Sequence, residues 1–243
     1  KETLVCGGRI VMERARQKNV HILPVDSEHS ALFQCINGEN PKEVKKMILT
    51  ASGGPFWGKT IQELRHISRE DALHHPNWEM GAKITVDSAT MMNKGLELIE
   101  AMWLYQLPFD RISIVVHRES ILHSMVEFCD HSIVAQLSQP DMRLPIQYAL
   151  TWPKRCPAVI PELDLAQIGT LSFYPPDEDT FRCLALAKQA AQKGGNMGAV
   201  LNGANEAAVS LFLDGKIGFL EIADLVDHAL ERAVFKEKPD LSE

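Results

Sequence analysis

Two acidic residues separated by one serine are the first side chains in this sequence that could do chemistry. Asp26, Ser27 and Glu28 follow an apolar run, residues 21–25, that we predict to be a strand. In an extended chain, residues two apart point to the same side, so both carboxylates would face one way. Carboxylate oxygens suit Mg²⁺ or Mn²⁺ better than zinc, which prefers histidine and cysteine. A solvated acidic turn is the alternative, and taken alone the motif favours it, because short acidic motifs often match by chance.

A second candidate group lies at a helix that should begin near Ser88. Asp87 or Ser88 would be a natural N-cap for a helix that runs to about Tyr105. The first-turn N–H groups and the positive end of the helix dipole would then be available to an anion. The segment therefore predicts anion binding at the start of this helix.

The same helix divides into a polar and an apolar face. Asn93, Lys94 and Glu97 share the polar face, so an amide, a cation and a carboxylate would lie together. The apolar face consists of Met92, Leu96, Ile99 and Trp103. A solvent-exposed lysine–glutamate pair is the alternative interpretation. Gly95 argues against it, because glycine inside a helix costs about 1 kcal/mol relative to alanine, and a close approach to the backbone would explain its presence.

Three further segments carry weaker signals. Residues 52–54, Ser-Gly-Gly, could cradle a phosphate at the end of a strand, although such a loop is most often only a turn. The loop 74–80 contains Trp78, which either closes over a ligand or packs back onto its own domain. His123 could contact a ligand or be a hydrogen-bonded core histidine, and the residue pattern alone favours the core.

Apolar periodicity predicts the elements that must position these groups. Helices are predicted over residues 4–17, 61–67, 68–73 and 88–105, and strands over residues 21–25, 44–51, 83–86, 111–116 and 132–137. After a proline-rich stretch, helices are predicted over residues 181–192, 197–213 and 220–235. We therefore expect an α+β fold: a mixed α/β catalytic domain with a small sheet, a crossing linker and a C-terminal helical bundle.

Bulk composition excludes several classes of protein. A formal net charge of -7 argues against a nucleic-acid-binding protein, which should show a basic stripe. No apolar run approaches the length of a membrane span, so we expect no membrane contact. The five cysteines are scattered without a C-x-x-C pair, which indicates reduced thiols and argues against a disulfide framework or a zinc site.

Eight stretches, in order along the chain, together resemble the 1-deoxy-D-xylulose 5-phosphate reductoisomerase family. They are residues 23–30, 52–56, 75–78, 81–84, 87–97, 121–127, 140–146 and 199–206. The match is collinear from Lys1 to about Val226. Members of this family rearrange 1-deoxy-D-xylulose 5-phosphate, by a retro-aldol step or a direct alkyl shift. NADPH then reduces the product to 2-C-methyl-D-erythritol 4-phosphate, early in isoprenoid biosynthesis by the non-mevalonate pathway.

The resemblance implies a role for each matching residue. The implied metal ligands are Asp26, Glu28 and Glu97, and the implied catalytic residues are Lys1, Glu28, His75 and Glu97. The implied substrate-binding residues are Ser27, Ser52, His75, Trp78, Ser88, Asn93, Lys94, Ser120 and His123. Trp78 and Met80 would belong to a flap over the substrate, and Gly81 and Met142 would contact the NADPH. The metal would be Mn²⁺ or Mg²⁺, with Co²⁺ possible.

The resemblance also implies how the chain is organised. Residues 1–25 would be the tail of the nucleotide-binding domain, 26–151 the catalytic metal and substrate domain, 152–178 the linker and 179–243 the C-terminal helical domain. The family's Rossmann domain, which binds most of the NADPH, would be missing or present only as its last elements. We therefore expect the chain alone to be inactive. The family implies a homodimer, in the cytoplasm of a bacterium or in a plastid-type organelle.

Two positions depart from the family pattern. Arg118 and Glu119 replace the usual proline and glutamine beside Ser120, which leaves the pose of that serine open. His131 stands where a turn glycine is usual, so the hairpin there could be shaped differently. The alternative function is a truncated, non-catalytic protein that binds a metal and a sugar phosphate. A Gly-rich strand-turn-helix encoded upstream of Lys1 would support the enzyme, whereas a start codon there would support the alternative.

Overall fold

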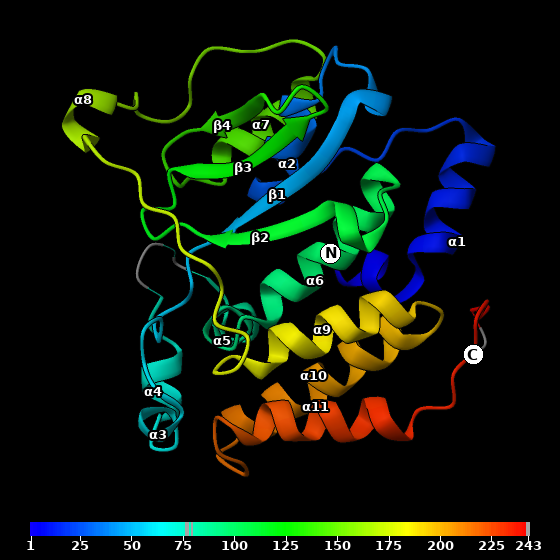
Figure 1. The fold of residues 1–243 in the computed structure, drawn as a ribbon, viewed down its shortest axis with the longest axis vertical. Helices are drawn as coiled ribbons and strands as arrows, with labels where there is room; N and C mark the ends of the chain where they lie inside the picture. Colours follow the sequence, from blue (N-terminus) through cyan, green and yellow to red (C-terminus); the bar gives the residue numbers. More distant parts are fainter. Residues whose placement is uncertain (76–77, 79, 242–243) are drawn as a thin grey trace. The chain divides into compact units, whose positions relative to one another are not determined.

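A computed structural model describes residues 1–75, 78 and 80–241 of the chain (Figure 1). Its contacts divide the chain into two units that are each assembled from separate segments. One unit, here called the helical unit, comprises residues 1–19, 53–109 and 177–243, and the other, the sheet unit, comprises residues 20–52 and 110–176. The predicted consecutive domains, bounded at residues 26, 152 and 179, stay a prediction.

The sheet unit is built on a four-stranded mixed sheet with the strand order β2-β1-β3-β4 among the described residues. The strands are β1 (Val44–Ala51), β2 (Ile112–Val116), β3 (Leu122–Phe128) and β4 (Ile133–Leu137). β1 pairs with β2 in parallel and with β3 antiparallel, and β3 pairs with β4 antiparallel. In this register Leu49 lies beside Ile114 on one side and Ser124 on the other. A strand with neighbours on both sides and helices nearby is buried, which explains the apolar run of β1.

Short helices complete the sheet unit. They are α2 (Ser27–Cys35), η1 (Pro41–Glu43), α7 (Arg143–Thr151) and α8 (Leu165–Ile168), and η2 (Phe109–Arg111) precedes β2. α2 lies against β3 and β4 and also contacts α7. The ring of Phe33 lies 6.2 Å from that of Tyr148 and 5.8 Å from that of Trp152, so an aromatic cluster joins α2 to α7.

The helical unit joins helices from both ends of the chain. Its helices are α1 (Glu2–Lys18), α3 (Ile61–Leu64), α4 (Arg69–Ala72), α5 (Ala82–Ala89), α6 (Met92–Tyr105), α9 (Arg182–Lys193), α10 (Met197–Leu213) and α11 (Glu221–Arg232). α6 contacts α1 and α9, and α10 contacts α1, α9 and α11. Figure 1 shows α9, α10 and α11 stacked side by side. None of the described helices is long and apolar enough to cross a membrane.

Gly95 explains how α6 and α9 pack. A Cβ at this position would lie 2.2 Å from the Cβ of Ala187 on α9, which no pair of carbon atoms tolerates. The close approach expected from the glycine in the sequence is therefore the neighbouring helix. Small residues on both sides let the two backbones come together, and Leu96 and Leu98 beside the contact are fully buried.

The predicted α+β class is confirmed, as are the helix over 4–17, the strands over 44–51, 111–116 and 132–137 and the three helices after residue 180. The short helices predicted within 61–73 are also present, as α3 and α4. Strand β3 was not predicted. Of the predicted loop 74–80, residues 76, 77 and 79 lie outside the described part of the chain.

Three predictions of local structure are wrong. Residues 83–86 have the β-branched composition of a strand but lie in α5, where Lys83 and Asp87 pair across one helical turn at 2.8 Å. Residues 21–25 form no hydrogen-bonded strand, because they have no partner strand in the sheet as described. The helix predicted to run from Ser88 to Tyr105 is two helices, broken where Met91 adopts φ 64°.

We predict that Gly95→Ala destabilises the chain by about 1–3 kcal/mol, because the added methyl group overpacks the α6–α9 contact. Gly203→Ala on α10 is the matched control, since nothing lies within 4 Å of a Cβ at that position. The control should gain about 1 kcal/mol from helix propensity. Urea unfolding of the two variants measures this, and equal effects of the two substitutions would contradict the packing.

Candidate metal and sugar-phosphate site

The acidic pair lies at the N-terminus of α2. Asp26 is the N-cap residue and Glu28 stands in the first turn, and carboxylate oxygens of the two approach within 4.8 Å of one another. The Ser27 hydroxyl donates a 2.5 Å hydrogen bond to Glu28 Oε2. The expected extended geometry is therefore wrong: a helix turn brings the two carboxylates together. The positive end of the helix dipole lowers the cost of placing two negative charges there.

His123 on β3 lies in the same unit as this acidic pair. It is 6% exposed, and its Nε2 lies 2.9 Å from the Ser138 hydroxyl oxygen. Burial lowers the pKa of His123, and the negative charge of Glu28 opposes the shift. A small cavity runs between the two elements and is lined by Ser27, Ser30, Gln34, His123, Gln136, Ser138, Asp141, Leu144 and Pro145. His123 thus has the hydrogen-bonded, buried environment of a core histidine and also lines the cavity that contains Ser27.

The loop between β2 and β3 holds Ser120 in a fixed turn. Ser120 adopts φ 54°, and His117 Nε2 accepts hydrogen bonds from the backbone N–H groups of Ile121 at 3.3 Å and Leu122 at 3.1 Å. Arg118 donates to the backbone carbonyl of Ser52. Glu119 accepts a 2.5 Å hydrogen bond from the Ser172 hydroxyl. Both charged residues that depart from the family pattern are therefore hydrogen-bonded.

His131, the other departure, keeps the turn that a glycine would make. It adopts φ 69° at the β3–β4 hairpin, and its backbone N–H donates to the Phe128 carbonyl at 3.0 Å. Its Nδ1 lies 2.9 Å from Glu127 Oε1. Lys45 and this histidine lower the pKa of Glu127 to about 2. A contact with Glu127 thus accompanies the left-handed conformation of His131.

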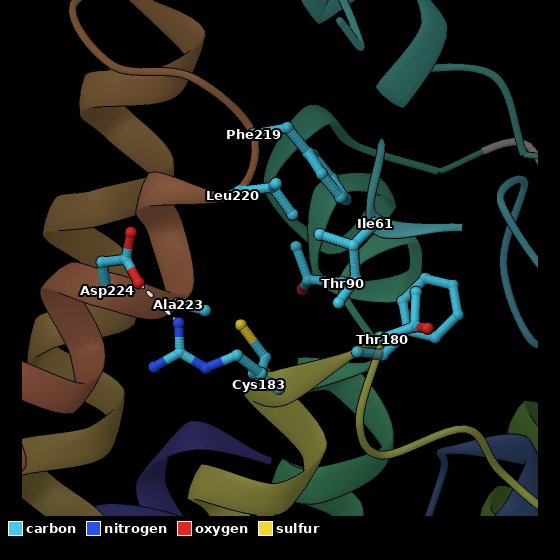
Figure 2. Close-up of a pocket in the computed structure, with 10 residues that line it drawn as sticks. Ile61, Thr90, Thr180, Cys183, Phe219, Leu220, Ala223 and Asp224 are labelled. Atoms are coloured by element: carbon cyan, nitrogen blue, oxygen red, sulfur yellow. Dashed lines mark hydrogen bonds and ion pairs between the residues drawn. The ribbon is translucent and has the colours of Figure 1, made fainter. Parts of the chain in front are cut away.

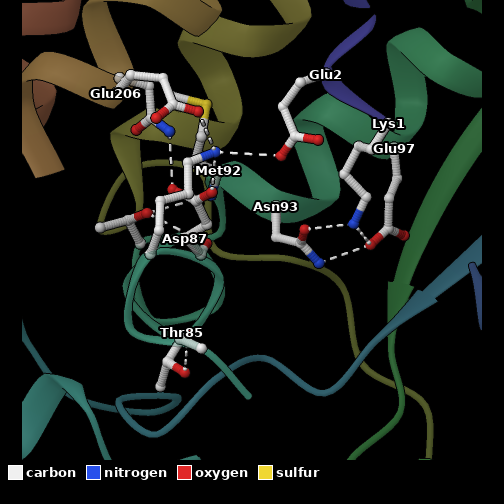
Figure 3. Close-up of polar contacts among 12 residues, drawn as sticks. Lys1, Glu2, Thr85, Asp87, Met92, Asn93, Glu97 and Glu206 are labelled. Atoms are coloured by element: carbon white, nitrogen blue, oxygen red, sulfur yellow. Dashed lines mark hydrogen bonds and ion pairs between the residues drawn. The ribbon is translucent and has the colours of Figure 1, made fainter. Parts of the chain in front are cut away.

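In the helical unit, the buried carboxylate of Glu97 on α6 contacts Asn93 and Lys1 (Figure 3) and also Lys94. Glu97 is 1% exposed, and its Oε1 accepts from Asn93 Nδ2 at 2.6 Å and from Lys1 Nζ at 3.3 Å. Lys1 Nζ also donates to Asn93 Oδ1 at 2.7 Å. Lys94 pairs with the other oxygen of Glu97 and is 4% exposed. The solvent-exposed lysine–glutamate pair considered from the sequence is therefore wrong.

This cluster combines groups that suit ions of both signs. Two ammonium groups, those of Lys1 and Lys94, contact the carboxylate of Glu97. Buried charges are tolerated when they are paired and hydrogen-bonded, as these are. The ammonium groups are suited to a phosphate group, whereas the carboxylate is suited to a divalent cation.

Ser88 lies on α5, close to the glycine loop. A Cβ at Gly54 would lie 2.6 Å from the backbone carbonyl oxygen of Ser88, and Gly54 adopts φ 68°, so a side chain is excluded there on both counts. The loop backbone thus lies against α5. The predicted N-cap role of Asp87 or Ser88 is wrong, because both lie in the last turns of α5. The first turn of α6, which begins after Met91, carries Asn93 and Lys94 instead.

The remaining predicted residues lie on loops and helix starts. Trp78 is half-buried, and its backbone N–H donates to His75 Nδ1 at 3.0 Å. Gly81 is exposed at the N-cap of α5, and Met142 is 37% exposed at the N-cap of α7. Met80 is half-buried beside Gly81.

A larger pocket in the helical unit involves none of the predicted residues (Figure 2). It has a volume of about 150 Å³ and is lined by Ile61, Thr90, Thr180, Phe181, Arg182, Cys183, Phe219, Leu220, Ala223 and Asp224. The Cys183 thiol is fully buried, which raises its pKa to about 12. The thiol is therefore protonated and unreactive at neutral pH. The lining is mostly apolar, and its two charged members, Arg182 and Asp224, pair with each other.

Two polar residues of the helical unit were missed from the sequence. Lys83 and Asn205 both bind the carboxylate of Asp87, at 2.8 Å each. Asn205 is fully buried. Its position inside an apolar helical stretch was a possible signal, because a buried amide requires a hydrogen-bonding partner.

Comparisons with known proteins agree with this arrangement. Residues 22–105 match the family described as the 1-deoxy-D-xylulose 5-phosphate reductoisomerase C-terminal domain, and residues 137–243 match the DXP reductoisomerase C-terminal domain. The chain belongs to the 1-deoxy-D-xylulose 5-phosphate reductoisomerase family. The reductoisomerase 2 of Bacillus anthracis is 57% identical over 244 residues, and the enzyme of Acetivibrio thermocellus is 56% identical over 243. All of this chain is covered in both matches, and it spans 64% of the length of each relative.

Solved reductoisomerase structures share the fold. The reductoisomerase of Zymomonas mobilis in complex with NADPH superposes with a TM-score of 0.92 and 45% identity, over 98% of this chain and 62% of that one. A reductoisomerase in complex with NADPH, fosmidomycin and magnesium gives a TM-score of 0.91 and 45% identity, over 95% of this chain and 59% of that one.

Burial of His123 predicts a contribution to pH-dependent stability. Its pKa lies below the ordinary value of 6.5, so the unfolded state takes up this proton first as the pH falls. The stability that depends on neutral His123 should therefore be complete above pH 6.5 and decline below it. Urea unfolding at pH 7.5 and 5.5 should show that the free energy of unfolding decreases less on acidification for His123→Gln than for the wild type. An NMR titration placing the His123 pKa above 6.5 would contradict this.

Proposed function

We propose that this chain is the metal- and sugar-phosphate-binding part of an NADPH-dependent 1-deoxy-D-xylulose 5-phosphate reductoisomerase. The observation that carries the proposal is the buried carboxylate of Glu97, held by Asn93 and by the two ammonium groups of Lys1 and Lys94. These are the positions that match the family's motif. The reaction would be the rearrangement and reduction of 1-deoxy-D-xylulose 5-phosphate to 2-C-methyl-D-erythritol 4-phosphate in isoprenoid biosynthesis.

The proposed metal ligands are Asp26, Glu28 and Glu97. Three carboxylates form a set of hard oxygen ligands that suits Mg²⁺ or Mn²⁺, with Co²⁺ also accepted. Magnesium is present in a structure of a related reductoisomerase, which supports its use here. The bound ion supplies a Lewis acid for the substrate oxygens.

The proposed phosphate site combines Ser88, Asn93 and Lys94 with Ser52 and the loop of Gly53 and Gly54. The glycine loop allows the backbone to approach a ligand, Ser88 offers a hydroxyl group, and Lys94 offers a positive charge. His75 and Ser120 would complete the contacts. These groups orient the sugar phosphate by binding the part of it that does not react.

The proposed roles of the other residues concern the reacting end. Lys1 would donate a hydrogen bond to a substrate oxygen near the metal, and Ser27 and His123 would line the rest of the pocket. His123 is neutral at pH 7, so it can share one proton in a hydrogen bond without adding charge. Trp78 would close over the bound substrate and exclude water.

The nicotinamide end of NADPH would lie against Gly81 and Met142, and a nucleotide-binding domain beyond this chain would hold the phosphates of the cofactor. NADPH is present in a structure of the Zymomonas mobilis relative, which supports this cofactor. The relatives from Bacillus anthracis and Acetivibrio thermocellus are bacterial, which supports a bacterial, cytoplasmic enzyme over a plastid enzyme. A homodimer is part of the same proposal.

We predict that Glu97→Gln weakens the binding of Mg²⁺ and Mn²⁺ by roughly tenfold or more, since the substitution removes an anionic ligand. In the intact enzyme it should abolish turnover and leave NADPH affinity nearly unchanged. Isothermal titration calorimetry measures the metal affinity. Glu231→Gln, at an exposed position on α11, is the control and should bind metal as the wild type does. An unaltered affinity in Glu97→Gln would show that Glu97 is not a ligand.

We also predict that fosmidomycin and Mg²⁺ together raise the melting temperature of the chain more than either one alone. A ligand that binds only the folded state at 100 times its Kd adds about 2.7 kcal/mol of stability. Because the metal would join the phosphonate ligand to the carboxylates, the combined shift should exceed the sum of the separate shifts. Simple additivity of the two shifts in differential scanning calorimetry would argue against a shared site.

A further inference from the structure

A second polar network in the helical unit includes Glu2, Asp87 and Glu206 (Figure 3), and Lys83 on α5 is its centre. Its ammonium group lies 2.8 Å from Asp87 Oδ2, 3.3 Å from Glu2 Oε1 and 3.2 Å from Glu206 Oε1. These carboxylates belong to three helices, α5, α1 and α10. One ammonium group therefore connects the start of α1 to α5 and to α10.

Asp87 is the buried member of the network. It is 1% exposed, and both of its oxygens are bound, Oδ2 by Lys83 and Oδ1 by Asn205 Nδ2 at 2.8 Å. Asn205 is completely buried on α10. A buried carboxylate with a cation on one oxygen and an amide on the other is fixed in rotation as well as in position.

The network adjoins two residues of the proposed site. Glu2, which binds Lys83, directly follows Lys1, whose ammonium group reaches Asn93 and Glu97. Asp87 directly precedes Ser88 on α5. The three-helix connection through Lys83 therefore lies one residue from the proposed substrate-oxygen donor and one residue from the proposed phosphate donor.

Stability alone does not account for such an arrangement. Replacing a buried ion pair by apolar side chains of similar volume is often neutral or stabilising, because the desolvation of two charges offsets their attraction. What the buried part of this network, Asp87 with Asn205 and Lys83, does provide is a single geometry, since each of the three must meet fixed partners. The relation of Lys1 to Ser88 is a geometry that the proposed reaction requires.

We propose that Lys83, Asp87 and Asn205 are positioning residues that set the Lys1 ammonium group and the Ser88 hydroxyl group relative to each other. The inference rests on the proposed function for the roles of Lys1 and Ser88. In this proposal the Asp87–Asn205 bond positions Ser88, the residue that follows Asp87. The Glu2–Lys83 bond positions Lys1, and Lys83 takes part in both connections because it also binds Asp87.

Three substitutions separate the two connections. Glu2→Gln weakens only the connection to α1, Asn205→Leu removes only the amide bound to Asp87, and Lys83→Met breaks both connections. Lys83→Arg is the conservative variant, because it keeps a cation that can reach more than one carboxylate. Lys18→Gln on α1 and Ser210→Ala on α10 are controls at exposed positions of the same helices.

Hydrogen exchange of the 243-residue chain measures the two connections independently of activity. The amides of Leu4 and Val5, which donate to the Lys1 carbonyl at 2.9 and 3.1 Å, report the start of α1. The amides of Thr85 and Thr90, bonded at 3.1 and 2.9 Å, report α5. Glu2→Gln should accelerate exchange roughly tenfold at the first pair only, Asn205→Leu at the second pair only, and Lys83→Met at both.

Affinity for fosmidomycin with Mg²⁺ tests the consequence for the ligand. Asn205→Leu and Lys83→Met should raise the Kd by roughly ten- to a hundredfold, since small displacements of binding groups are costly. Lys83→Arg and the two controls should stay within roughly threefold of the wild type. Wild-type exchange and affinity in Lys83→Met would overturn the proposal. So would uniform acceleration at both pairs in all three variants, because that pattern indicates a loss of general stability.

The outcomes also separate this inference from the proposed function. If the wild-type chain binds neither Mg²⁺ nor fosmidomycin, the proposed function fails, and the exchange pattern still decides whether the network holds α1 and α5. If the wild type binds both and the exchange pattern is absent, the positioning proposal fails, and the proposed function stands.

Discussion

The helical unit depends on accommodating the charge of one buried carboxylate, that of Glu97. This side chain lies on a helix, α6, that packs against α1 and α9. Because it is only 1% exposed, solvent cannot hydrate its charge. Asn93 and two lysines take that role, and one of the lysines comes from the residue before α1. The same groups that make burial tolerable give the cluster its capacity to bind ions. Stability and chemistry thus draw on the same few atoms.

Close packing and polar placement are linked along α6. The glycine at position 95 allows α9 to approach one side of the helix, and the polar residues on the other side are thereby held at a fixed depth. The break at Met91 also affects the placement of polar residues, because it separates α5 from α6 and each helix then carries a different polar residue. A continuous helix would place Ser88 and Asn93 at positions determined by helical periodicity alone.

The sequence predicted well what depends on local pattern. The amphipathic helices after residue 180 and the apolar strand at residues 44–51 have strong periodicity, and their existence followed from it. The elements predicted wrongly are those decided by distant contacts. Residues 83–86 have a strand-like composition, but Lys83 also pairs with Glu2 and Glu206 on helices distant in sequence, and no local window contains those two contacts. The acidic residues Asp26 and Glu28 were picked out correctly as neighbours, for the wrong geometric reason. The resemblance to a known family identified site residues that composition alone did not. Neither the resemblance nor the composition identified Asn205, because its hydrogen-bond partner is 118 positions away in the sequence.

The division of the chain into interleaved units has a consequence for synthesis on the ribosome. The sheet unit can close once residue 176 has emerged, whereas α1, α5 and α6 remain without α9, α10 and α11 until residues 182–232 have been synthesised. During that interval the apolar face of α6, with its glycine, is open to solvent. Contacts between residues far apart in sequence form slowly, and exposed apolar surface invites aggregation. The nascent chain is therefore prone to aggregation during this interval, and slow translation of residues 177–232 would lengthen it.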